Sequence, residues 1–172
     1  MNICLCRMTA DKMRSFFLDF AYDPDTFDTP DACLTYKYDQ AQADVFYKKH
    51  NRADRAHFAV MLGNEVIGDL YLKHIDMQAK SCTLSIHMKN DSVKNQGYGT
   101  AAETLALQYA FEQLGLNTVF ADVLSRNLRS RHVLEKVGFV LTGVDERLCY
   151  YRCDKDAWTP LDVPKMPVGG SV

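Results

Sequence analysis

A stretch in the middle of the chain, residues 93–100, combines residue types and spacing that suit anion binding. It reads VKNQGYGT, with glycines at positions 97 and 99. An alternating segment, 82–88, predicts a strand before it, and apolar periodicity predicts a helix from about Thr100 to Leu114 after it. A helix start presents unpaired N–H groups and partial positive charge, and two glycines let the backbone approach a ligand closely. The stretch therefore predicts a phosphate or pyrophosphate site.

Two common phosphate motifs do not describe this loop. The pattern G-x-x-x-x-G-K-[ST] is absent from the chain. The dinucleotide pattern G-x-G-x-x-G is not met, because Ala102 holds its third place and, more importantly, no parallel βαβ unit surrounds the loop. On spacing alone, a strand-to-helix turn with two flexible residues explains the glycines equally well.

Two motifs at a matching distance carry a family resemblance. Lys94-Asn95-Gln96-Gly97-Tyr98-Gly99 resembles the R/Q-x-x-G-x-G/A signature of the GNAT superfamily of N-acetyltransferases, which cradles the pyrophosphate of acetyl-CoA. Asn127-Leu128-Arg129-Ser130, followed by LEKVGF at 134–139, resembles the N-x-x-S…L-E-K-x-G-F block of the RimJ/RimL-like branch. The resemblance covers about residues 2–158 in element order. It departs at Lys94, because lysine supplies charge without the planar fork of arginine.

The resemblance implies roles for residues along the two motifs. The cofactor-binding residues would be Met88, Lys94, Asn95, Gln96, Gly97, Tyr98, Gly99, Thr100 and Asn127. Ser130 lies where the branch places a serine that contacts or protonates the CoA sulfur, although a serine in a first helical turn can equally be a capping or solvated residue. The usual glutamate position on the fourth strand holds Thr83 or Leu84, so we expect His87, with an ordinary pKa of about 6.5, as the base. A histidine satisfied by a backbone carbonyl is the alternative.

The acceptor is the part that the sequence determines least. Aspartates and aromatic rings are interleaved between residues 19 and 44, and the family places its acceptor wall there. We expect Asp25, Phe27, Asp28 and Tyr36 to bind a cationic amine such as an aminoglycoside, a polyamine or a basic peptide N-terminus. A solvated acidic loop, whose aspartates cap helices and turns, is the other interpretation.

The elements that must position these residues follow from periodicity and punctuation. We expect strands at 2–8, 56–62, 65–74, 82–88, 118–124, 139–142 and 146–153, and helices at 10–20, 39–50, 100–114 and 127–137. Gly143 is expected to join the last two strands. This order is that of an α+β GNAT fold, a mixed central sheet that is splayed between its fourth and fifth strands at the cofactor site and flanked by about four helices. We expect one domain at 1–158 and a C-terminal tail at 159–172.

Composition narrows the functional classes. The chain has 172 residues, 47% of them hydrophobic, and a net charge of −2, which speaks against a general nucleic-acid-binding role. No apolar run is long enough to span a membrane, and the N-terminus lacks the pattern of a signal peptide. The six cysteines have no zinc-module spacing, so we expect no metal, reduced thiols and a cytoplasmic location.

The resulting hypothesis is an acetyl-CoA-dependent N-acetyltransferase that acts on a primary amine by direct transfer in a ternary complex. The acceptor is a small-molecule amine or a peptide N-terminus. A GNAT-fold acyl-CoA-binding module with little catalysis is the alternative from another functional class. Whether the protein is a monomer or a homodimer stays open.

Overall fold

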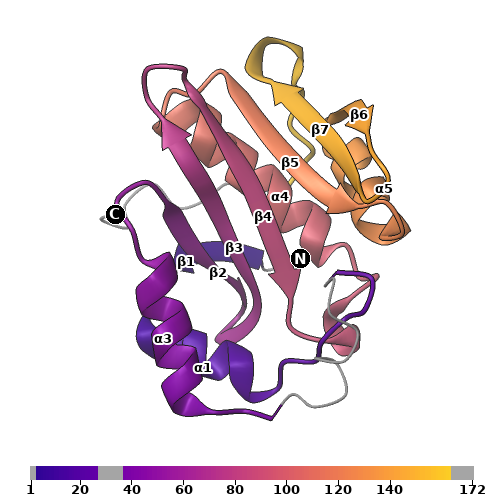
Figure 1. The fold of residues 1–172 in the computed structure, drawn as a ribbon. Helices are drawn as coiled ribbons and strands as arrows, with labels where there is room; N and C mark the ends of the chain where they lie inside the picture. Colours follow the sequence, from indigo (N-terminus) through magenta and orange to yellow (C-terminus); the bar gives the residue numbers. More distant parts are fainter. Residues whose placement is uncertain (1–2, 27–36, 164–172) are drawn as a thin grey trace.

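A seven-stranded mixed sheet runs through the molecule in the order β1-β2-β3-β4-β5-β7-β6 (Figure 1). The structure is a computed structural model that describes residues 3–26 and 37–163. The strands are β1 (Ile3–Arg7), β2 (Ala56–Leu62), β3 (Glu65–Asp76), β4 (Ser81–Met88), β5 (Thr118–Leu124), β6 (Val140–Val144) and β7 (Leu148–Asp154). All neighbouring strands are antiparallel except β4 and β5, which are parallel. The expected order of strands along the chain and the GNAT-type α+β fold are confirmed.

Four α-helices accompany the sheet in the described part of the chain: α1 (Ala10–Leu18), α3 (Gln40–His50), α4 (Tyr98–Gln108) and α5 (Leu128–Lys136). Short 3-10 turns lie at η1 (Asp91–Val93) and η3 (Lys155–Ala157), and α4 continues as a π-helical turn, η2 (Tyr109–Gln113). Capping side chains begin three of the helices. Thr9, Asp39 and Asn127 accept backbone N–H bonds from Lys12, Ala41 and Ser130 at 3.3, 2.8 and 3.0 Å.

The two faces of the sheet carry separate apolar cores. In β2, Phe58 and Val60 join the core beneath α4, whereas Ala59 and Met61 join the core beneath α1 and α3. This alternation places α4 on one face and the α1–α3 pair on the other (Figure 1). The arrangement leaves the end of the central strands accessible from both faces.

β4 and β5 separate soon after they meet. Their register joins only Ser81–Thr118, Cys82–Val119 and Thr83–Phe120. From Leu84 onward, β4 keeps β3 as its neighbour, while β5 pairs with β7 up to Leu124. The splay between the fourth and fifth strands is therefore present as expected.

Several expected boundaries need correction. Gly143 lies inside β6 beside a register irregularity, and the turn between the last two strands is 145–147. The carboxylate of Asp145 makes that turn, because it accepts the N–H bonds of Arg147 and Leu148 at 2.8 and 2.6 Å. The first helix ends at Leu18 rather than Phe20, and η2 replaces the last α-helical turn expected before Leu114.

The chain beyond η3 is described only to residue 163. Leu161 and Val163 pack against the core beneath α4, so the first part of the expected tail contacts the domain. None of the helices in the described part is long and apolar enough to cross a membrane.

Candidate active site

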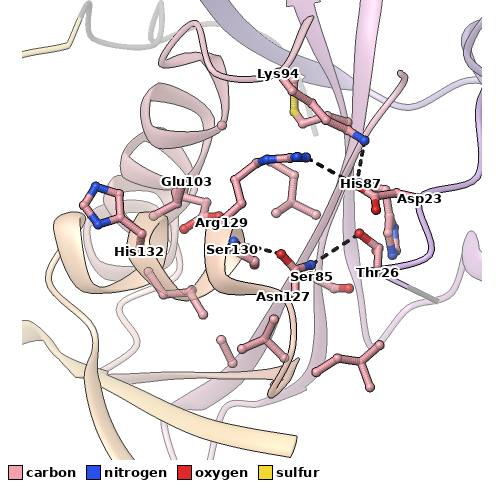
Figure 2. A pocket seen from close by; sticks show the side chains of 18 of the residues that line it. Asp23, Thr26, Ser85, His87, Lys94, Glu103, Asn127, Arg129, Ser130 and His132 are labelled. Atoms are coloured by element: carbon pink, nitrogen blue, oxygen red, sulfur yellow. Dashed lines mark hydrogen bonds and ion pairs between the residues drawn. The ribbon is translucent and has the colours of Figure 1, made fainter. Parts of the chain in front are cut away.

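A cavity of about 820 Å³ opens where β4 and β5 part (Figure 2). We call it the cofactor cavity. Its walls come from the end of β4 (84–88), the end of β5 (121–124), the glycine loop, the first turns of α4 and the first turns of α5. Segment 20–26, between α1 and α3, closes one side through Phe20, Ala21, Asp23 and Thr26. The volume is in the range of small-molecule and cofactor sites.

The glycine loop has the geometry of an anion site. Gly97 is the N-cap of α4 with φ +79°, a left-handed conformation that glycine adopts without strain. A Cβ added at Gly99 would meet no other atom within 4 Å, so this residue faces open space in the cavity wall. The first helical bond runs from the Ala101 N–H to the Gly97 carbonyl at 3.0 Å. The N–H groups of residues 98–100 therefore have no partner within the helix and can bind an anion.

Most residues that the sequence predicted for the cofactor line this cavity, together with the two predicted catalytic residues, His87 and Ser130. The predicted cofactor-binding residues on its wall are Met88, Lys94, Asn95, Gly97, Gly99, Thr100 and Asn127. Gln96 and Tyr98 are not part of the lining that the described residues form. The Gln96 amide donates to the Ser92 carbonyl, and Tyr98 packs against the core.

An ionic cluster joins the glycine loop to the segment after α1 and to α5 (Figure 2). The Lys94 ammonium lies 2.6 Å from Asp23 Oδ2 and 2.8 Å from Asp91 Oδ1, and Arg129 Nη1 lies 3.3 Å from Asp23 Oδ2. Burial raises the pKa of Asp23, but the hydrogen bond from Lys94 and the nearby charges outweigh it and hold this pKa below its ordinary value. Lys94 thus shares its charge with two carboxylates, and Asp23 is shared between Lys94 and Arg129. No local pattern in the sequence predicts these long-range pairs.

Asn127 and Ser130 are fixed together at the start of α5. Asn127 accepts the Ser130 N–H through Oδ1 and donates through Nδ2 to Thr26 Oγ1 at 3.3 Å (Figure 2). The Ser130 hydroxyl lies on the cavity wall and is not needed for the cap, which uses its backbone N–H. It is therefore placed to contact a bound ligand.

A buried carboxyl that the sequence analysis missed also lines the cofactor cavity. Glu103 lies one helical turn after Gly99 on α4 and is 2% exposed. Its Oε2 has no hydrogen-bond partner within residues 3–26 and 37–163. Burial raises the pKa of Glu103 to about 8, so the carboxyl is mainly protonated at neutral pH. The available signal was a single charged residue in the helix, whose residues 100–107 are all buried.

A second cavity of about 290 Å³ lies beneath α1 and α3, on the other face of the sheet. We call it the aromatic cavity. Its lining includes the rings of Phe16, Phe17, Phe20, Tyr22, Phe46 and Tyr71. Asp69 and Asp39 also line it, and its described lining contains no lysine or arginine. His87 and Phe20 belong to the linings of both cavities, so the two spaces meet at the end of β4.

Histidines surround the floor of the aromatic cavity. Burial lowers the pKa of both His87 and His50, which favours neutral rings at pH 7. His57 Nε2 lies 2.5 Å from Asp69 Oδ1, and both side chains are buried. The sequence analysis singled out neither His57 nor Asp69, although a charged residue within an apolar strand is an unusual feature.

The expected acceptor residues are only partly described. Asp25 is exposed, donates its backbone N–H to Asp23 Oδ1 at 2.9 Å, and lies outside the described linings of both cavities. Phe27, Asp28 and Tyr36 lie outside the described residues. Among the described residues, acidic and aromatic side chains of the kind expected for the acceptor wall line the aromatic cavity.

Comparison with known protein families identifies proteins that are similar to this chain. A family model, the acetyltransferase (GNAT) domain, matches residues 2–140. The chain belongs to this family. The probable N-acetyltransferase YjcK of Bacillus subtilis is 29% identical over 101 residues, which are 58% of this chain and 56% of that protein. The match therefore spans little more than half the length of this curated relative.

Solved GNAT structures share the fold. The spermidine N-acetyltransferase of Vibrio cholerae, solved in complex with CoA and spermine, is 18% identical with a TM-score of 0.69, covering 90% of this chain and 96% of its own. The N-acetyltransferase PseH of Campylobacter jejuni is 21% identical with a TM-score of 0.66, covering 89% of this chain and 98% of its own. At these identities, the likeness shows that the GNAT fold is common to all three.

The cofactor of GNAT acetyltransferases, acetyl-CoA, fits the groups present in this cavity. The unpaired N–H groups at the start of α4 and the open space at Gly99 suit a pyrophosphate. The strand end 84–88, which has lost β5 as a neighbour, can offer backbone groups to an amide-containing arm. The donor set is thus one for an extended, anionic ligand rather than for a metal ion.

Proposed function

We propose that this protein is an acetyl-CoA-dependent N-acetyltransferase that acetylates the primary amine of a small cationic molecule by direct transfer in a ternary complex. The observation that carries the proposal is the meeting of two cavities at His87. One cavity has the donor groups for a CoA pyrophosphate, and the other is apolar, aromatic and acidic. Because they come from opposite faces of the splayed sheet, a cofactor and an amine can approach each other there without a covalent enzyme intermediate.

Each side of the site has a defined task. Bound acetyl-CoA supplies an activated thioester. The first turn of α4 holds the phosphates, Asn127 orients the arm, and the Ser130 hydroxyl holds a proton that a departing thiolate can accept. An amine attacks only without its extra proton. His87, whose pKa is lowered by burial so that its ring is mainly neutral at pH 7, lies where the two cavities meet and is proposed to receive that proton.

The acceptor is proposed as a small molecule rather than a protein N-terminus. The aromatic cavity is limited to about 290 Å³, which suits a short amine better than a folded partner. Its aromatic rings and aspartates favour a cation. The name of the Vibrio cholerae structure, a spermidine acetyltransferase, supports a polyamine-like acceptor as a candidate. The LEKVGF block supports a RimJ/RimL-like assignment, and the cysteine usage supports the cytoplasm.

The test is an amine panel with acetyl-CoA as donor. We expect thiol release, and an acetylated product by mass spectrometry, with polyamines or aminoglycosides at higher kcat/KM than with short peptides. Turnover of peptides alone would contradict the small-molecule acceptor. Tight CoA binding without turnover of any amine would instead favour an acyl-CoA-binding module.

Ser130→Ala should lower kcat about tenfold, which corresponds to about 1.4 kcal/mol of transition-state stabilisation. Affinity for acetyl-CoA should stay the same, because the backbone N–H bond to Asn127 survives the substitution. Steady-state kinetics and calorimetry measure the two quantities. Ser15→Ala, at an exposed position on α1, is the matched control. Unchanged kcat in Ser130→Ala, with chemistry rate-limiting, would limit this serine to its place in the helix start.

A further inference from the structure

Asp69 is a buried carboxylate at the floor of the aromatic cavity. It lies in β3, is 1% exposed, and has His57 as its only ion-pair partner within the described residues. A buried charge is costly unless it is paired. The charge state of His57 therefore decides whether Asp69 is already neutralised.

The hydrogen bonds of His57 indicate a neutral ring. Nε2 contacts Asp69 Oδ1 at 2.5 Å, while the buried Nδ1 has no partner in the described part of the chain. A protonated imidazole carries two N–H donors, so one of them would be buried without an acceptor. The neutral ring that donates from Nε2 leaves only an unused lone pair at Nδ1. It orients Asp69 and leaves the carboxylate with a net negative charge.

The other groups around Asp69 do not remove this charge. His50 and His87 have lowered pKa values and are neutral at pH 7. The Arg55 guanidinium lies over the Tyr71 ring, 5.7 Å from its centroid, and forms no ion pair with Asp69. The cavity itself is lined by aromatic rings and has no lysine or arginine among its described residues. A cation that enters it would meet both a carboxylate and aromatic faces.

The β3–β4 register places Asp69 beside His87, where the two cavities meet, but outside the cofactor cavity. Asp69 is directly opposite His87 in the β3–β4 pair, where backbone Cα atoms are about 4.5–5.5 Å apart. His87 borders both cavities, whereas Asp69 borders only the aromatic cavity. An amine nitrogen that reaches the junction leaves the rest of its molecule alongside Asp69.

We propose that Asp69, oriented by His57, binds a second cationic nitrogen of the acceptor and so makes the enzyme prefer diamines and polyamines over monoamines. This inference rests on the proposed function. Asp69 then determines which amines are preferred, and His57 is a positioning residue that orients the Asp69 carboxylate. The recognition site is the floor of the aromatic cavity on β2 and β3 rather than the acidic loop after α1.

The test compares putrescine with pentylamine, in which a methyl group replaces the second ammonium. We expect the wild-type kcat/KM to be about 10–100-fold higher for putrescine, in line with one charge-assisted hydrogen bond. Asp69→Asn should remove this preference by raising KM for putrescine relative to pentylamine. The Kd for CoA should stay the same, because Asp69 does not line the cofactor cavity. Asp156→Asn, at an exposed position outside both cavities, is the matched control. If the Asp69→Asn variant does not fold, the Asp69→Ala variant is used for the same measurements.

His57 is tested by the conservative variant. His57→Leu should lower the preference for putrescine, and His57→Gln, which keeps an N–H donor, should restore part of it. A purely structural role for His57 would instead change both substrates equally.

Binding separates this inference from the proposed function. Calorimetric titration of putrescine into the CoA complex should show binding that Asp69→Asn loses. If putrescine binds in this way but no amine is acetylated, the proposed function is wrong, but the role of Asp69 in binding a second cationic nitrogen stands. If amines are acetylated with no preference for putrescine, or with a preference that Asp69→Asn retains, this role of Asp69 is overturned.

Discussion

Gly99→Val is expected to weaken CoA binding at least about 100-fold while the protein remains folded. A Cβ at this position has no neighbour within 4 Å beyond the adjoining backbone of its own helix, so the substitution has room in the apo protein. It enters the space in front of the N–H groups of residues 98–100, where the pyrophosphate would accept hydrogen bonds. Loss of two bonds to a charged group, at about 1.5–3 kcal/mol each, accounts for an effect of this size. Calorimetry with CoA measures it.

The glycine that is substituted decides whether a loss of CoA binding can be separated from a change in the backbone. Gly97 has φ +79°, so valine there adds backbone strain, and lost binding could reflect a distorted helix start. Gly143 is the better control, because its φ is not positive, its nearest neighbour is a Tyr150 carbon at 3.8 Å from a Cβ, and it lies in β6 away from the cavity. Gly143→Val should bind CoA normally. A folded Gly99→Val protein with wild-type affinity would show that the glycine loop does not hold the cofactor.

Glu103→Gln should stabilise the protein above pH 5 and flatten the dependence of its stability on pH. The pKa of Glu103 is about 8 in the folded protein, against an ordinary value of 4.5 in the unfolded chain. Between these values the folded state keeps a proton that the unfolded state has lost, so wild-type stability falls as pH rises from about 4.5 to 8. Below pH 4 both states are protonated and the two proteins should be equally stable.

The size of this effect follows from the shift. Its upper bound at pH 8 is on the order of 4–5 kcal/mol, which corresponds to roughly 10 °C in Tm for a protein of this length. Thermal unfolding from pH 4 to pH 9 measures it, with Glu112→Gln, an exposed position in η2, as the control. Parallel pH curves for wild type and Glu103→Gln would mean that Glu103 has a partner in solution or is accessible to water.

The parts of this site that are local in sequence could be predicted, and the parts that depend on register could not. The glycine loop and the starts of three helices depend on residues a few positions apart, so the local pattern was sufficient to predict them. The structure shows that Thr9, Asp39 and Asn127 cap these helices. His57 and Asp69 meet only because the β2–β3 pairing sets His57 opposite Tyr71, two residues from Asp69. A register irregularity at Val60 and Met61 lies in the same hairpin, and sequence periodicity does not reveal it.

Ion pairs between residues far apart in the sequence could not be predicted either. Lys94 was expected to bind the cofactor through its charge, and nothing in the sequence indicated that its ammonium contacts Asp23, which is 71 positions away. The turn at 145–147 was misplaced for a different reason: glycine is a general turn signal, yet the Asp145 carboxylate makes this turn, while Gly143 lies beside a strand irregularity.

The early parting of β4 and β5 has a consequence for amide hydrogen exchange. After the last shared pair, Thr83–Phe120, β4 has only β3 as a neighbour and β5 has only β7, although neither is an edge strand of the sheet. Amides that point into the gap have no ladder partner and should exchange quickly in the free protein, as those of an edge strand do. A bound ligand that accepts those N–H bonds should slow their exchange, so that the footprint of the cofactor can be mapped at the centre of the molecule.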